Sequence, residues 1–175
     1  MKQISTVRKI SGVLALILFL QALVFAGIGG KEAAYIGGTV PGFNGEKDPV
    51  VGELDTSNND QVRFLPKDKK HKSKEFSISY QKFIDIEYGQ KAGRRVGAAT
   101  AGLVLLGPIG LIGLFSKKRK HYVTIGYKDA EDKDQVAVIE VGKDIIRTTL
   151  SILETRSGKK IEYQDKEAEK AGKGN

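Results

Sequence analysis

A stretch of twenty apolar and small residues, 96–115, constrains this chain more than any other feature. It is long enough to cross a bilayer, yet short β-type runs continue on both sides of it. Because a single crossing would place those runs on opposite sides of a membrane, the stretch interrupts a fold instead of marking its edge. Basic residues flank it on both sides, namely Arg94, Arg95, Lys117, Lys118, Arg119 and Lys120.

Three arrangements of this apolar segment are open at the level of sequence. Its ten strongly apolar residues contribute about −3 to −6 kcal/mol on insertion scales, and one unbroken helix would be about 30 Å long. Inside a helix, a proline costs about 3 kcal/mol and each glycine about 1 kcal/mol of helix stability relative to alanine. Residues 107–110, Gly-Pro-Ile-Gly, therefore favour a hairpin that returns to one membrane surface. A complete span and a soluble loop packed on its own domain are the alternatives. The residues expected in the membrane are Val96, Leu103, Leu105, Leu106, Pro108, Leu111, Leu114 and Phe115.

The basic flanks predict the chemistry of the membrane partner. In a hairpin they gather at the headgroup level, where each lysine or arginine contributes about 1 kcal/mol against anionic lipid. In a complete span, Lys91, Arg94 and Arg95 would lie on one side and the four basic residues 117–120 on the other, so they carry little orientation signal. We therefore expect anionic lipids as partners, with headgroup contacts from Arg94, Arg95, Lys117, Lys118, Arg119 and Lys120.

Small residues recur every four positions at Gly93, Gly97 and Ala101. Such a face lets two helices approach closely, within one chain or between copies, and so predicts a possible homo-oligomer. The alternative is that these residues only allow the segment to pack on its own sheet.

The N-terminus has the pattern of an export signal. Basic residues precede the apolar run 10–25, and Val24 and Ala26 are small enough for a signal-peptidase site. We expect residues 1–26 to be a cleaved signal peptide or a retained N-terminal anchor, followed by a linker over 27–34. This places the remainder on the periplasmic side of the cell envelope.

The rest of the chain is predicted to be mainly β. Runs at 35–40, 50–55, 61–65, 75–80, 84–88, 123–127 and 136–141 have strand character, and turn-forming residues separate them. Residues 143–157 change to helical spacing and stop at Gly158. Residues 160–163 return as a short extended piece, and the charged residues 164–175 are expected to form a disordered tail.

Seven strands followed by one amphipathic helix is the order of pleckstrin-homology-like folds, including GRAM-like modules. Residues 76–88, FSISYQKFIDIEY, resemble the middle strand pair of bacterial members. Residues 87–97 and 116–122 are similar to a family of uncharacterised bacterial exported proteins with a glycine-rich hydrophobic insert. The resemblance implies a pleckstrin-like β domain over 35–163, a seven-stranded sheet or barrel with a C-terminal helix, interrupted by the membrane insert 96–115. It implies no particular ligand, because this fold class binds lipids, peptides and proteins at unrelated sites.

Other residue patterns predict little chemistry. The lysine-rich loop 67–74 either contacts acidic headgroups or simply protects a sheet edge. His71 and His121 each lie in a basic run with no carboxylate placed to orient them, so we expect no metal site. The chain has no cysteine and no phosphate-binding or nucleophile motif, and we expect no cofactor and no catalytic residue. Nucleic-acid binding is not expected, because no aromatic-rich binding sheet accompanies the basic runs.

These observations predict a non-enzymatic, membrane-associated adaptor or scaffold of the bacterial cell envelope. It would dock through the apolar segment and its basic flanks. The alternative is a self-assembling structural membrane protein whose glycine-rich inserts pack together. The sequence decides neither the partner nor the oligomeric state.

Overall fold

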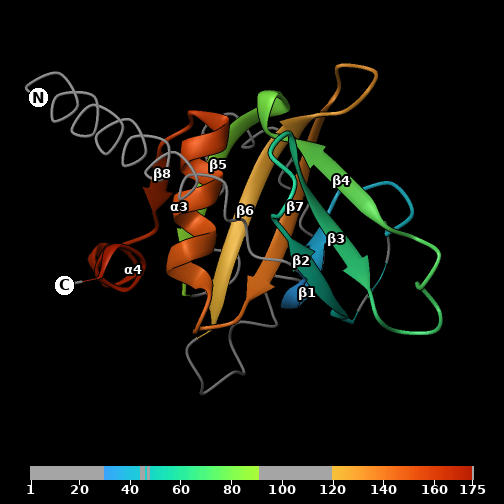
Figure 1. Ribbon diagram of the computed structural model, residues 1–175, viewed down its shortest axis with the longest axis horizontal. Helices are drawn as coiled ribbons and strands as arrows, with labels where there is room; N and C mark the ends of the chain where they lie inside the picture. The colour runs from blue at the N-terminus through green and yellow to red at the C-terminus, as the bar shows by residue number, and fades with distance from the viewer. Residues whose placement is uncertain (1–29, 44–45, 47, 91–119, 175) are drawn as a thin grey trace, which may run out of the picture.

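The predicted strands assemble into one curled eight-stranded sheet (Figure 1). The computed structural model describes residues 30–43, 46, 48–90 and 120–174 of the chain. The sheet order is β4-β3-β2-β1-β7-β6-β5-β8, and every neighbouring pair is antiparallel except β5 and β8. The strands are β1 (Lys31–Gly38), β2 (Val50–Asp55), β3 (Gln61–Pro66), β4 (Phe76–Ser79), β5 (Phe83–Gly89), β6 (His121–Lys128), β7 (Asp134–Val141) and β8 (Ile161–Tyr163). The sequence-based expectation of a mainly β protein is therefore confirmed.

Two helices follow the seventh strand, and the first of them covers one face of the sheet (Figure 1). Helix α3 (Ile146–Ser157) ends at Gly158, whose φ of 69° is the left-handed conformation that glycine adopts without strain. Arg156 in its last turn donates to the carbonyl of Asn58 at 2.8 Å and lies over the Tyr80 ring at 5.6 Å. These contacts fix the end of α3 to the β2–β3 turn and to the one-turn 3-10 helix η2 (Tyr80–Lys82).

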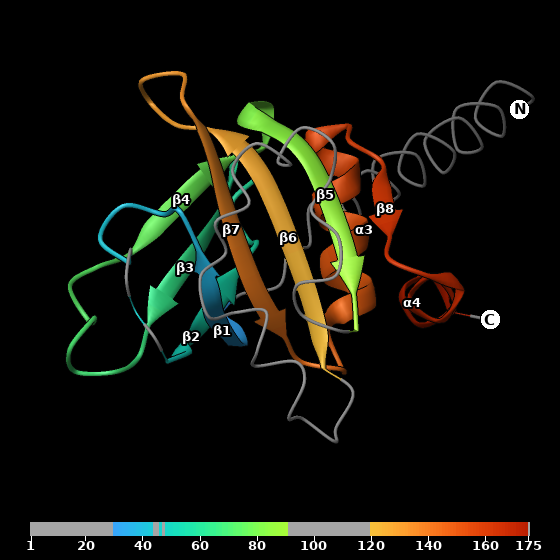
Figure 2. The same ribbon diagram turned by 180° about the vertical axis from the view of Figure 1, so that it is seen from behind.

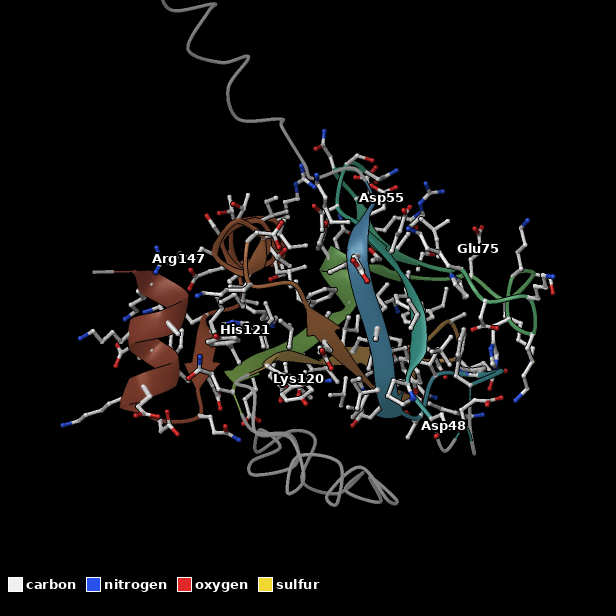
Figure 3. All side chains as sticks on the ribbon, turned by 90° about the horizontal axis from the view of Figure 1, so that it is seen from below. Asp48, Asp55, Glu75, Lys120, His121 and Arg147 are labelled. Atoms are coloured by element: carbon white, nitrogen blue, oxygen red, sulfur yellow. The ribbon has the colours of Figure 1, made fainter. Side chains whose placement is uncertain are left out.

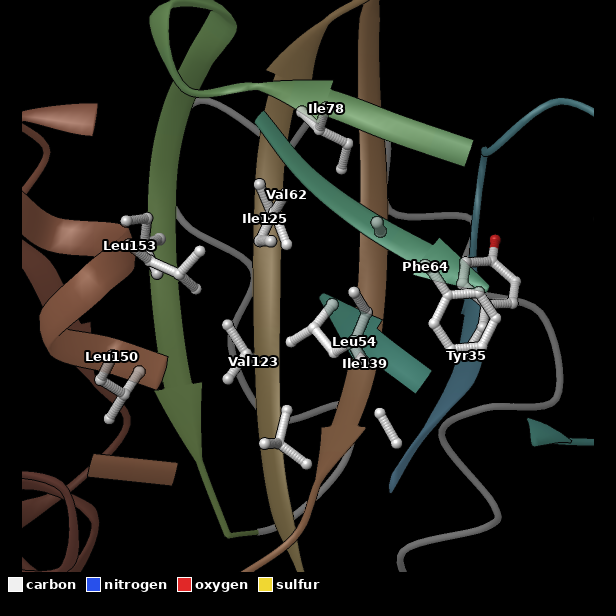
Figure 4. Packing of buried hydrophobic residues seen from close by; sticks show 14 of the residues in the cluster. Tyr35, Leu54, Val62, Phe64, Ile78, Val123, Ile125, Ile139, Leu150 and Leu153 are labelled. Atoms are coloured by element: carbon white, nitrogen blue, oxygen red, sulfur yellow. The ribbon is translucent and has the colours of Figure 1, made fainter. Parts of the chain in front are cut away.

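The face of the sheet that α3 covers, called the inner face, carries the main hydrophobic core (Figure 4). Period-two alternation along the strands explains which residues point into it, since cross-strand partners share a face. Ile86, Ile125 and Leu153 bring β5, β6 and α3 together, and each is 0% exposed. Tyr35 and Phe64 extend the core toward β1 and β3, with ring centroids 6.4 Å apart. The core thus unites strands from before and after the apolar segment.

The predicted linker over 27–34 is wrong in its second half. Residues 31–34 belong to β1, where Ala33 pairs with Gly52 on one side and with Val141 on the other. Two consecutive alanines looked like a spacer, but Ala33 is 5% exposed and belongs to the core.

The predicted disordered tail is also wrong, because α4 (Lys166–Lys173) forms within it. Asp165 caps this helix by accepting a hydrogen bond from the Ala168 amide at 2.8 Å. Ala168 is 0% exposed, and a Cβ at Gly172 would approach Cε1 of Tyr163 to 2.6 Å. The charged composition of this segment suggested disorder, but Ala168 and Gly172 form a small-residue face that packs closely against the rest of the domain.

The predicted signal peptide or anchor, 1–26, and the apolar segment, 96–115, lie outside the described residues. Among the residues that the structure describes, no helix is long and apolar enough to span a membrane.

The packing of α3 predicts a large and local stability effect. Replacing Leu153 by Ala removes a fully buried side chain, and the free energy of unfolding should fall by about 2–5 kcal/mol. Ser151→Ala, two residues away and on the exposed side of the helix, is the matched control and should change the free energy of unfolding by less than about 0.5 kcal/mol. Urea denaturation followed by circular dichroism measures both, and equal effects would contradict the assignment of the inner face.

Candidate functional site

Both long undescribed segments join the domain at the same end of the sheet (Figure 2). Strand β1 starts at Lys31, β5 ends at Gly89 and β6 starts at His121. The register aligns these points, because Val141 pairs with both Ala33 and His121, and Gly89 pairs with Tyr122. We call this part of the sheet the attachment end. The N-terminal segment and both ends of the 91–119 segment therefore meet the domain there.

The pairing of β5 with β6 limits what the apolar segment can do. The two strands are paired from Phe83 with Tyr127 to Gly89 with Tyr122. A single membrane crossing between them would place one strand on each side of the bilayer, which this pairing forbids. Of the three arrangements open from the sequence, the folded domain is compatible with a hairpin or a self-packed loop.

One predicted headgroup residue, Lys120, falls within the described structure. Its Nζ lies 2.8 Å from Oε2 of Glu140 on β7, and its side chain is 34% exposed (Figure 3). This ion pair competes with any contact to an anionic headgroup. Outside the described residues lie the other predicted contacts and packing positions: Gly93, Arg94, Arg95, Val96, Gly97, Ala101, Leu103, Leu105, Leu106, Pro108, Leu111, Leu114, Phe115, Lys117, Lys118 and Arg119.

Basic residues are unevenly divided between the described residues and the rest of the chain. Ten of the 29 Lys and Arg residues, and none of the 21 Asp and Glu residues, lie outside the described positions. The described residues therefore carry 19 basic against 21 acidic side chains, although the whole chain has a formal charge of +8. In the sequence, nearly all of the other ten basic residues flank the two apolar segments.

A shallow depression of about 440 Å³ opens at the attachment end. Lys31, Glu32, Lys120, Glu140 and Asp144 lie around it, together with apolar residues of β1, β2 and β7. Because acidic and basic groups alternate around its rim, it does not concentrate a field of either sign on one point.

Tyr88 and His121 join β5 to β6 directly beside the apolar segment. Tyr88 Oη lies 2.6 Å from His121 Nδ1, and the rings stack at 6.0 Å with an angle of 8° between them. Burial lowers the pKa of His121, with Lys143 acting in the same direction, and burial raises the pKa of Tyr88 to about 12. The two side chains share a buried hydrogen bond, and the tautomer of the imidazole sets which of them donates.

His71, in the lysine-rich loop, contradicts our expectation that no carboxylate orients it. It is 4% exposed, with Nδ1 at 2.8 Å from Asp68 Oδ1 and Nε2 at 2.9 Å from Glu46 Oε1. The Glu46 carboxylate, followed by Asp68, raises the pKa of His71. Lys70 also binds Glu46 at 2.8 Å. The partner Glu46 is distant in sequence, and no local pattern could have revealed it.

These contacts favour the edge-protecting role of the loop 67–74 over a free cationic surface. Lys67 pairs with Glu53 at 2.7 Å, Lys70 is held by Glu46, and Lys74 donates to the carbonyl of Gly42 at 3.2 Å. Three of the loop lysines are therefore engaged by the domain. Within the described ranges, no group of three His, Cys, Asp or Glu side chains is arranged to hold a metal ion.

No family model and no curated protein matches this chain. Its function must therefore be argued from its own geometry.

The Tyr88–His121 pair predicts an energetic coupling between β5 and β6. Tyr88→Phe should lower the free energy of unfolding by about 1–2 kcal/mol, because the buried imidazole loses its hydrogen-bond partner. In a double-mutant cycle with His121→Phe, the double variant should lose less free energy of unfolding than the two single variants lose together. The difference should be about 0.5 kcal/mol or more. Urea unfolding at neutral pH measures the cycle, and additive costs would show that the contact is not energetically coupled.

His71 predicts a pH-dependent stability of the loop region. A folded-state pKa raised above the usual 6.5 gives stability that is complete below that value and lost as pH rises through the folded pKa. Replacement by Gln should therefore lower the melting temperature more at about pH 5.5 than at about pH 9. Wild type and variant both retain His121, so its opposite contribution cancels in the difference. A difference in melting temperature that does not vary with pH would refute the charged contact.

Proposed function

We propose that this chain is a membrane-associated, non-catalytic adaptor or scaffold of the bacterial cell envelope. The observation that carries the proposal is the convergence of three chain connections, at Gly30, Gln90 and Lys120, on one end of the sheet. Two apolar segments then leave the domain toward the same side and can reach one lipid surface together. The body is held at that surface by its attachment end, and its other surfaces stay available to a protein partner.

The domain itself is proposed to be pleckstrin-homology-like. Seven sequential strands followed by α3 support this assignment, as does the position of α3 across one face of the curled sheet. Strand β8 and helix α4 are additions after that helix, and β8 pairs in parallel with β5. Because folds of this kind carry unrelated ligand sites, the proposed lipid contact rests on the attachment end and not on the fold type.

The charge distribution supports anionic lipid as the surface that is recognised. The body is nearly neutral, whereas the basic residues accompany the apolar segments. Basic groups beside an inserted segment gain about 1 kcal/mol each at an anionic surface, and salt screens this gain. Apolar insertion and electrostatic attraction then act at the same place.

Vesicle flotation tests this proposal. Replacing Arg94, Arg95, Lys117 and Lys118 by Gln should weaken binding to phosphatidylglycerol-containing vesicles about tenfold or more, and high salt should weaken wild-type binding similarly. The matched control replaces four exposed body lysines, Lys69, Lys72, Lys159 and Lys160, by Gln and should bind almost as wild type does. In a chain that lacks residues 1–26, Leu105→Asp combined with Leu111→Asp should abolish flotation, because each aspartate costs about 2.5–3.5 kcal/mol in the membrane.

Equal losses in the two charge variants would contradict a localised contact, and flotation that survives the aspartates would contradict insertion. Discrete crosslinked oligomers that disappear with Gly97→Leu, in a protein that does not float, would favour the self-assembling alternative.

A further inference from the structure

The sheet has a second apolar surface on its outer face, the face opposite α3 (Figure 2). Five residues of the three central strands make it up, and we call them the outer strip: Ala34, Ile36, Tyr122, Val136 and Val138. The register confirms their orientation. Tyr122 pairs with Glu140, and Val138 pairs with Thr124, whereas the intervening Val123 and Ile139 point into the core.

The outer strip is buried although no described helix or strand packs over it. Ile36 and Tyr122 are each 4% exposed, Val138 is 3% and Val136 is 1%. Burial raises the pKa of Tyr122 to about 12, with Glu140 acting in the same direction. A one-sided antiparallel sheet normally presents polar residues on its solvent face. An apolar, buried outer face therefore requires an occupant.

Position and length identify the occupant. Tyr122 is two residues from Lys120, so the strip begins directly at the base of the 91–119 segment. Along β6 it extends from Tyr122 to Gly126, the partner of Val136, which is about 13 Å at about 3.3 Å per residue. Half of the apolar segment, up to its Gly107-Pro108 turn, would be about 16 Å long as a helix. The segment can thus cover the strip without leaving its own domain.

The charges beside the strip are complementary to the flanks of that segment. Asp85 and Glu87 lie on the outer face of β5, opposite Gly126 and Thr124 respectively. Glu87 is 6% exposed, and burial is the main cause that raises the pKa of Asp85. In sequence, the basic residues Lys91, Arg94, Arg95 and 117–119 adjoin Gln90 and Lys120 at the attachment end, whereas Glu87 and Asp85 lie two and four residues inward from Gly89 along β5.

We propose that the outer strip is the docking site of the chain's own apolar segment, 96–115. The proposal does not require lipid binding and can hold even if the proposed membrane function fails. Where both hold, the same apolar side chains are shared between the sheet and the bilayer, so the outer strip competes with the membrane for the segment.

Cysteine accessibility tests the docking site, and the chain's lack of cysteine makes each introduced thiol unique. Val138→Cys is placed in the full chain and in a variant whose residues 96–115 are replaced by a Gly/Ser linker of equal length. A water-soluble maleimide should label Val138→Cys at least tenfold more slowly in the full chain than in the linker variant. Ala130→Cys, in the exposed β6–β7 turn, is the control and should react equally in both. Circular dichroism checks that both chains are folded.

Equal labelling of Val138→Cys in the two chains would overturn the proposal. Protection that persists in the linker variant would also overturn it, since the N-terminal segment or a second copy would then be the occupant. Protection that falls on dilution of the full chain would assign the site to a second copy. A separate experiment uses Val138→Asp, which places a charge on the outer strip and should weaken docking of the apolar segment there. If the membrane function also holds, the released segment should raise flotation of the full chain several-fold. Failure of that experiment alone leaves the labelling result standing and counts against membrane docking.

Discussion

The pairing of β5 with β6 is the interaction on which the rest of this structure depends. It closes a connection of 31 residues, 90–120, between two strands that share the sheet and the core. Closing so long a connection costs conformational entropy that grows only slowly with length, and the burial of Ile86 and Ile125 at 0% exposure offsets it. Because the pairing holds, Gln90 and Lys120, which border the undescribed residues 91–119, lie at one end of the domain. The attachment end and the proposed membrane geometry follow from that constraint.

Local periodicity was enough to predict most of the architecture. Period-two runs located the strands, and helical spacing ending at Gly158 located α3. What failed depended on long-range packing. The tail around Ala168 and Gly172 has a charged composition, yet a few small residues dock α4 against aromatic neighbours. The linker was missed for the same reason, since Ala33 gains its role only from Gly52 and Val141.

The candidate site was predictable in kind but not in place. The sequence predicted a site at the apolar segment and its basic flanks, and of those residues only Lys120 lies within the described structure. It could not indicate that Gly30, Gln90 and Lys120 converge, because convergence is a property of strand order. Nor could it indicate the outer strip, since Tyr122 and Val138 meet only through the β6–β7 register. His71 illustrates the same limit, because Glu46 approaches it from a distant turn.

The strand order also determines how neighbouring copies can meet when they are crowded on one surface. The sheet ends in β4 on one side and β8 on the other, strands of four and three residues. Edge strands this short expose few unpaired amides and carbonyls, and so offer a poor template for strand addition by another molecule. Copies crowded together on a membrane surface would otherwise be prone to aggregate by pairing their edge strands. Short edges let many copies lie side by side and remain separate folded units.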